Sequence, residues 1–228
     1  MNTAPGLESM AQDRAAAEDW LGVALVRERQ AQEAVRQGDL QEAATRFREA
    51  LSLFVMLDDG YRTGHALADL AEVRLAQGDY LAAAELSGQA IDRIPGDPRS
   101  LTTLGYAEWR AGSPSDAEVT FSRALHWAPA AAPALAGRGQ VRAQLGNFTD
   151  ALDDLDRVRA DDLPAGELLP ADRADVLAAR ALALAGLGRA AEARDELARS
   201  TKLDPDRRQT LVHADRIAAL TARPQSAR

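Results

Sequence analysis

The residues best placed for acid–base chemistry in this chain are His65, Asp69 and Glu72, spaced four and three residues apart. On a helix this spacing puts them on one face, where an imidazole beside two carboxylates is suited to proton transfer. No zinc-protease, serine-hydrolase, phosphate-loop or dinucleotide-binding motif accompanies them in the sequence. The three residues leave one catalytic alternative open, which is an enzyme built on a helical-repeat scaffold. Because no catalytic motif accompanies them, we expect that the chain is not an enzyme.

Metal chemistry has little support in the sequence. The densest acidic run is Asp150, Asp153, Asp154, Asp156, Asp161 and Asp162. A calcium loop needs ligands at alternate positions, a central glycine and a closing glutamate, and this run has none of these. The three histidines, at 65, 126 and 213, fall on separate predicted helices, and the chain has no cysteine. We therefore expect neither a metal nor a cofactor.

A repeating pattern of small residues positions these side chains. Five glycines have similar surroundings, namely Gly38, Gly78, Gly112, Gly146 and Gly188. Each follows a small residue by seven positions and precedes an alanine by five. By subtraction, the glycines lie 40, 34, 34 and 42 residues apart. This period is typical of a helix–turn–helix repeat, in which a left-handed glycine ends the first helix.

The pattern resembles the tetratricopeptide repeat (TPR) family over roughly residues 24–207. Further matches are a leucine eleven residues before the glycine, a large residue nine after it and a proline seventeen after it. The leucine is present as Leu67, Leu101, Leu135 and Leu177. The large residue is Phe47, Phe121, Leu155 or Leu197, and the proline is Pro95, Pro129 or Pro205. Four positions depart from the pattern: Arg27 replaces the leucine, Ser87 replaces the large residue, and Val55 and Leu163 replace the proline.

The resemblance implies an all-α, right-handed α-solenoid of about five TPR repeats with capping helices at both ends. We expect an N-terminal extension at 1–23, and a capping helix and tail at 205–228. The expected repeats are 24–63, 64–97, 98–131, 132–173 and 174–204. One helical stretch is expected near 7–37, bent near Gly22. The segment 161–172 is expected to be a loop or a broken helix start, where Leu168 and Leu169 either contact a partner or fold back.

In TPR proteins the first helix of each repeat lines a concave groove. The resemblance therefore implies a groove that binds a peptide or helix of a partner protein. Counting back from each glycine at helical periodicity, with the adjacent Asp69 and Arg110 included, gives these candidates: His65, Asp69, Glu72, Arg99, Thr102, Tyr106, Trp109, Arg110, Gln140 and Leu182. Tyr, Trp and Arg dominate binding hot spots, so Arg99, Tyr106, Trp109 and Arg110 lead. The alternative for Trp109 is packing against a neighbouring helix.

One known TPR activity is not expected here. TPR co-chaperones hold the C-terminal carboxylate of a chaperone with lysine, asparagine and arginine. The corresponding residues of this chain are Glu28, Gln32, Asp69, Arg99 and Thr103, and only Arg99 suits an anion.

Charge and composition limit the classes of partner that we expect. The net charge is −8 and the pI is near 5.0, whereas nucleic-acid-binding proteins usually carry a basic surface. Several basic residues cluster near the C-terminal end of the sequence. They form either a local basic stripe or ordinary solvated helix faces: Arg194, Arg199, Lys202, Arg207, Arg208 and Arg216. No apolar stretch reaches membrane-spanning length, and no secretory signal is evident. We expect a bacterial, cytoplasmic protein that binds neither nucleic acid nor membrane.

The function expected from the resemblance is that of a protein-interaction scaffold or adaptor with a protein or peptide partner. The alternative is a regulatory sensor module that controls a transcription factor or signalling partner. A homodimer, formed through the groove or the N-terminal helix, is a further possibility.

Overall fold

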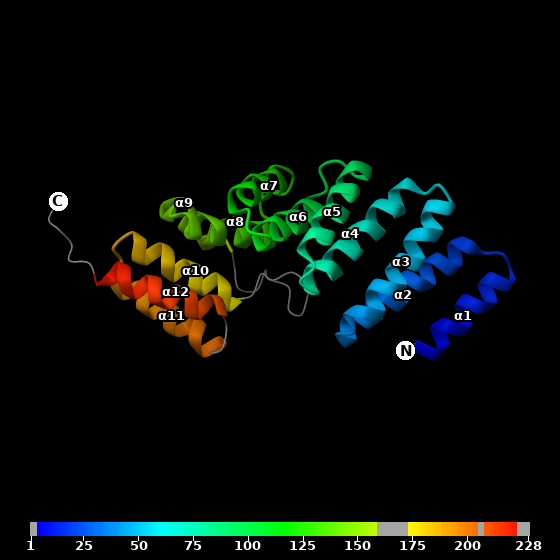
Figure 1. Cartoon of the computed structure of the whole chain (residues 1–228), viewed down its shortest axis with the longest axis horizontal. Coiled ribbons are helices and arrows are strands. Elements are labelled where there is room, and N and C mark those ends of the chain that lie inside the picture. Colours follow the sequence, from blue (N-terminus) through cyan, green and yellow to red (C-terminus); the bar gives the residue numbers. More distant parts are fainter. Residues whose placement is uncertain (1–3, 159–172, 205–207, 223–228) are drawn as a thin grey trace. The chain divides into compact units, whose positions relative to one another are not determined.

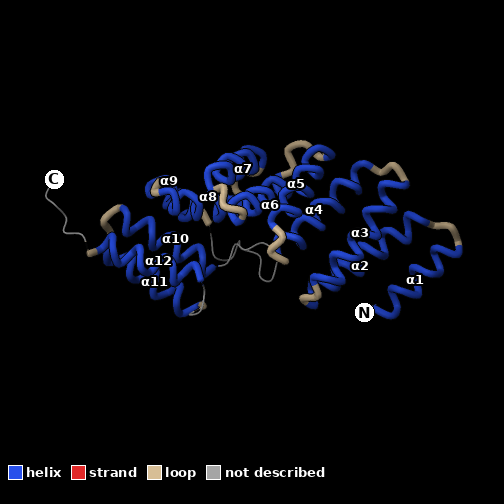
Figure 2. Tube along the Cα trace, in the orientation of Figure 1, coloured by secondary structure: helices blue, strands red, loops and turns tan. Residues whose placement is uncertain are grey.

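The computed structural model describes residues 4–158, 173–204 and 208–222, and these residues form twelve α-helices (Figures 1 and 2). The expected all-α fold is confirmed. Successive helices pack in sequential pairs, as in a TPR solenoid. The chain divides into two compact units, one ending at residue 111 and the other beginning at residue 112.

The first unit contains six helices. They are α1 (Ala4–Ala16), α2 (Trp20–Gln37), α3 (Leu40–Met56), α4 (Gly60–Ala76), α5 (Tyr80–Arg93) and α6 (Pro98–Arg110). The described part of the second unit contains six more: α7 (Pro114–Trp127), α8 (Ala132–Leu145), α9 (Phe148–Asp156), α10 (Arg173–Gly186), α11 (Ala190–Leu203) and α12 (Arg208–Thr221). The 161–172 segment lies outside the described residues, as does Pro205.

The five repeated glycines adopt the predicted left-handed conformation. Their φ values run from 77° to 97°, a region that side chains other than glycine rarely occupy. Gly38 shows the resulting turn: its N–H donates to Val35, and the N–H of Asp39 donates to Ala34. These hydrogen bonds satisfy the last carbonyls of α2, and the Asp39 side chain then caps α3 by accepting from the N–H of Glu42.

The small residues before these turns lie where two helices make close contact. A Cβ added to Gly139 in α8 would stand 2.6 Å from Leu155 Cγ and 3.2 Å from the Ala151 carbonyl oxygen in α9. A Cβ added to Gly137 would stand 2.4 Å from the Phe121 ring in α7. Glycine therefore sets the spacing between α8 and its two neighbours.

The expectation of one helix near 7–37 bent at Gly22 is wrong. Helix α1 ends at Ala16 and α2 begins at Trp20, because Glu18 has a φ of 58° and Asp19 caps the new helix. The Asp19 carboxylate accepts a hydrogen bond from the Gly22 N–H at 2.9 Å. Gly22 thus lies inside the first turn of α2, without interrupting it.

Helix α1 packs against α2 through Leu7, Ala11 and Val26, which are buried together. Beside this contact Glu8 pairs with Arg27 of α2. Hydrogen bonds from Arg27 and Gln30 lower the pKa of Glu8 to about 2. An ion pair therefore accompanies the apolar contact that holds α1.

Candidate functional site

Helices α2, α4 and α6 are the first helices of the first three predicted repeats, and their charged side chains meet on one side of the first unit. We call this group the A-helix face and define it by Glu28, His65, Asp69, Glu72 and Arg99. Three of these residues lie four and three positions apart on α4, as the helical period requires. Sequence analysis had predicted all of them except Glu28 as site residues.

Arg99 is held at the start of α6 by the local sequence. The Asp97 carboxylate accepts a hydrogen bond from the Ser100 N–H at 2.9 Å, and Pro98 occupies the first helical turn. Such a cap followed by proline fixes where a helix begins. Arg99 is therefore in the first turn of α6, directed toward α4.

The guanidinium of Arg99 joins two carboxylates of α4. Its Nη2 lies 2.6 Å from Asp69 Oδ1 and 2.7 Å from Glu72 Oε2, and its Nε lies 2.5 Å from Glu72 Oε1. The side chains of Asp69 and Glu72 are 11% and 12% exposed, whereas that of Arg99 is 44% exposed. The arginine thus keeps one side in water while it neutralises carboxylates that are nearly buried.

Burial raises the pKa of two carboxyl groups on this face. For Glu28 the causes are burial first and the negative charge of Asp69 second. Burial also raises the pKa of Asp69, and Arg99 offsets part of that effect. For Arg99, burial alone would lower the pKa, but hydrogen bonds and charge from Glu72 and Asp69 outweigh it, so the pKa is raised.

The A-helix face carries a surplus of negative charge. Three carboxylates, those of Glu28, Asp69 and Glu72, lie on the same face as the guanidinium of Arg99. The positive charge of Arg62 also acts on Glu28, but Arg62 is paired with Asp59. His65 is half-buried, and its ring lies edge-on to that of Tyr61 with centroids 4.5 Å apart. A cationic group placed on this face would therefore be attracted by carboxylates that are partly removed from water.

Several predicted contact residues are buried. The side chain of Thr102 is 3% exposed and its hydroxyl donates to the Pro98 carbonyl at 2.6 Å. Tyr106 is fully buried, and Trp109 is 8% exposed with its ring centroid 6.2 Å from that of Tyr106. The Arg110 guanidinium lies 4.7 Å from the Trp109 ring centroid, within cation–π range.

The two remaining candidates belong to the second unit. Gln140 of α8 is 1% exposed, and Leu182 of α10 is fully buried. Neither offers surface to a partner in this structure, nor does Tyr106 or Thr102. The other predicted contact residues, namely His65, Asp69, Glu72, Arg99, Trp109 and Arg110, keep at least some exposed surface.

Two features were missed as site features by sequence analysis. Glu28 was noted only because it differs from the residue that TPR co-chaperones use to bind a carboxylate. An acidic residue at that position was itself a sign that the ligand is basic. The second is a cavity among α9, α10 and α11 lined by Arg173, Arg180, Arg199 and Lys202. Of these four, Arg199 and Lys202 belong to the late basic residues noted in the sequence.

Metal-binding clusters and membrane-spanning helices are both absent from the described part of the chain. Within the described ranges, no three His, Asp or Glu side chains are grouped to hold a metal ion. Among the helices that the structure describes, none has the length and hydropathy needed to cross a bilayer.

The chain was compared with known sequences and structures. A sequence model of the tetratricopeptide repeat matches residues 28–98 and 144–208, and a second matches residues 74–136. No curated protein matches the chain.

Solved TPR structures are similar in fold. YrrB, described as a TPR protein with an unusual peptide-binding site, is 18% identical, with a TM-score of 0.56 over 84% of this chain and 92% of YrrB. PilF of Pseudomonas aeruginosa is 14% identical, with a TM-score of 0.61 over 86% and 80%. TTC0263, a thermophilic TPR protein of Thermus thermophilus, is 25% identical, with a TM-score of 0.51 over 83% and 98%. With more than half of its length matched by one family model, the chain belongs to the tetratricopeptide repeat family.

Proposed function

We propose that this protein is a non-enzymatic interaction scaffold whose A-helix face binds a basic peptide or helix of a partner protein. TPR proteins are generally protein–protein interaction modules and are typically non-catalytic. The observation that carries the finer proposal is the acidic surplus around Arg99. A lysine or arginine of the partner would pair with Glu28, close to the negative charge of Asp69.

The burial of the carboxylates explains why a basic segment would bind with specificity. Asp69 and Glu72 are nearly buried, so an attraction there is weakened less by solvent than one on an open surface. Arg99 also repels a cation placed directly on it, which favours a segment whose charges lie toward Glu28. The peptide-binding site reported for YrrB supports peptide recognition by this fold through analogy only.

Photo-crosslinking tests the proposal at the level of single residues. We would replace His65, which is half-buried on the A-helix face, with a photoreactive benzoylphenylalanine and irradiate cells that produce the full chain. The matched position is Leu81 on α5, which is 78% exposed. The expected result is that position 65 captures a partner peptide rich in Lys and Arg, whereas position 81 captures no such peptide.

A charge variant connects the capture to the acidic surplus. Glu28→Gln should weaken capture at position 65, and raised salt should weaken it further. Glu85→Gln, on the exposed side of α5, serves as the control and should leave capture unchanged. The proposal would be contradicted if partners were captured only at position 81. It would also be contradicted if neither Glu28→Gln nor raised salt changed the capture at position 65.

A further inference from the structure

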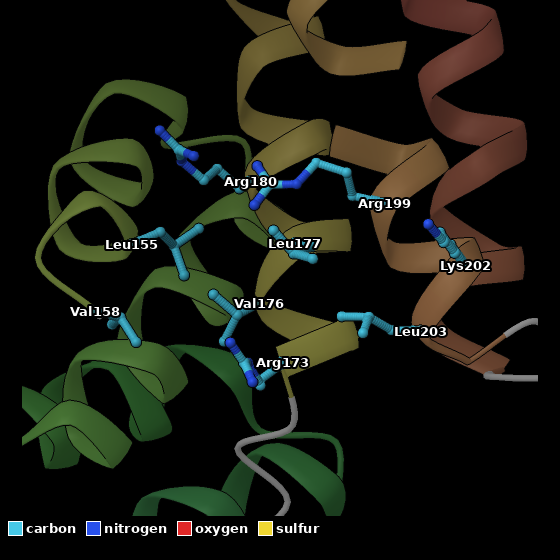
Figure 3. A pocket seen from close by; sticks show the side chains of 9 residues that line it. All are labelled: Leu155, Val158, Arg173, Val176, Leu177, Arg180, Arg199, Lys202 and Leu203. Carbon is cyan, nitrogen blue, oxygen red and sulfur yellow. The ribbon is translucent and has the colours of Figure 1, made fainter. Parts of the chain in front are cut away.

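A cavity of about 600 Å³ lies among α9, α10 and α11 in the second unit. Figure 3 shows side chains from these helices turned toward the same space. Its apolar side chains are Leu155, Val158, Val176, Leu177 and Leu203. We call it the cationic cavity, because every charged side chain that lines it is an arginine or lysine.

The cavity lies at the end of α9, which is a short helix. Helix α9 has nine residues, whereas α7 and α11 have 14 each. The other residues that line the cavity come from the beginning and middle of α10 and the end of α11. Leu203, in the last turn of α11, is 56% exposed although it borders this partly apolar space.

The charges around the cavity are not balanced. Arg180 lies 2.7 Å from Asp156 and 2.8 Å from Glu196, and Arg199 lies 3.0 Å from Glu196. Arg173 and Lys202 are exposed and form no ion pair with any described residue. Among the described residues, two cations at the cavity therefore have no ion-pair partner, in a chain whose net charge is −8.

We propose that the cationic cavity binds a partner peptide that presents an aliphatic side chain flanked by carboxylates. The aliphatic group would cover Val176, Leu177 and Leu203, and so remove apolar surface from water. The carboxylates would pair with Arg173 and Lys202. This surface belongs to the second unit, whereas the A-helix face belongs to the first. Its charge preference is the opposite one, so the two sites would select different ligands.

The test is a selection from a phage-displayed library of random peptides on the immobilised full chain. We expect the enriched peptides to combine Leu, Ile or Val with Asp or Glu. The double charge reversal Arg173→Glu/Lys202→Glu should weaken binding of a fluorescein-labelled enriched peptide at least about tenfold. Leu203→Ser, at an exposed position, should also weaken it, because the apolar contact is lost.

The matched control is Arg48→Glu/Arg123→Glu, which changes net charge equally at exposed arginines of α3 and α7. It should leave binding of the enriched peptide close to that of the wild type. The proposal is overturned if no acidic-aliphatic peptide is enriched, or if both double variants bind the peptide equally. It is also overturned if the chain self-associates and the Arg173→Glu/Lys202→Glu reversal abolishes that association, because the occupant would then be a second copy.

Discussion

The guanidinium of Arg99 at the start of α6 lies 2.6 Å from the carboxylate of Asp69 in the middle of α4. The same arginine binds Glu72 one turn further along α4. One side chain thus connects the first helices of two consecutive predicted repeats and neutralises two carboxylates that are almost removed from solvent. Its removal has consequences for stability that are independent of any partner.

We predict that Arg99→Ala destabilises the first unit. Leaving buried carboxylates without a partner costs about 3–5 kcal/mol at fully buried sites, and the 44% exposure of Arg99 lowers our expectation to about 1–3 kcal/mol. The urea midpoint at neutral pH measures the loss. The loss should shrink in mild acid, because burial raises the pKa of Asp69 and its protonation removes part of the unpaired charge.

The control for this prediction is Arg62→Ala. Arg62 pairs with Asp59 within the first turn of α4 and is 45% exposed, so we expect a midpoint close to that of the wild type. Equal losses from Arg99→Ala and Arg62→Ala would show that the connection between α6 and α4 is no stronger than a surface ion pair.

We predict that His213 makes the second unit sensitive to acid. Burial, and then the charge of Arg216, lower the pKa of His213 from 6.5 to about 4. The unfolded chain therefore binds a proton more readily than the folded chain between these values, and stability falls as the pH drops from 6.5 toward 4. Relative to His213→Gln, the wild type should lose about 1–3 kcal/mol over this range.

Urea unfolding of both proteins at several pH values provides the measurement. The raised pKa values of Glu28 and Asp69 act in the opposite direction, because the folded chain then binds protons more readily. Those contributions are common to both proteins and cancel in the difference. Parallel pH profiles for the wild type and His213→Gln would refute the role of His213.

We predict that Gly137→Ala destabilises the contact between α8 and α7. The new methyl group would begin 2.4 Å from the Phe121 ring, which is fully buried and has little space to move. Overpacking of this kind costs about 1–3 kcal/mol. The double variant Gly137→Ala/Phe121→Leu should recover part of the loss, as measured by thermal unfolding.

A second glycine in a helix shows the opposite behaviour. Gly88 lies within α5, and a Cβ added there meets nothing within 4 Å. Gly88→Ala should therefore raise stability by about 0.5–1 kcal/mol through helix propensity alone. If both Gly→Ala variants moved the thermal midpoint in the same direction, the crowding argument for Gly137 would fail.

We predict that Glu8→Gln loosens α1. Glu8 pairs with Arg27 of α2, and its pKa of about 2 lies below the ordinary 4.5. Its contribution is therefore complete above pH 4.5 and is lost as the pH falls toward 2. Because the side chain is 38% exposed, we expect a loss of only about 1 kcal/mol.

Hydrogen exchange of the backbone amides in α1 measures this local loss. The amides of α4 and α5 provide an internal reference that should not change. Glu33→Gln is the matched variant, because the ion pair of Glu33 is with Arg36 inside α2. Faster exchange in α1 with Glu33→Gln as well would remove the argument for a specific Glu8–Arg27 interaction.

The fold could be predicted from the sequence because its rules are local. A left-handed glycine, a small residue seven positions earlier and an alanine five positions later act within one pair of helices, and each rule recurs five times. The break at Glu18 was missed because it occurs once, outside the repeats. No sequence pattern predicts a positive φ at a glutamate. The nearby Gly22 instead suggested a bend at the wrong residue.

The candidate site was predicted only in part. Helical periodicity placed His65, Asp69 and Glu72 on one face, because that relationship lies within a single helix. Burial of Tyr106 and Trp109 depends on what surrounds α6, which periodicity does not reveal. The cationic cavity was missed because side chains of three different helices line it, and helical periodicity within one helix does not show which helices come together.

The order of contacts along the chain also affects how the protein is made. Within the described residues, helices that pack closely are neighbours in sequence or are separated by a single helix. Chains with such local contacts fold fast, because little loop entropy is lost before a contact forms. Each helical hairpin can therefore assemble as it leaves the ribosome, while the rest of the chain is still being synthesised.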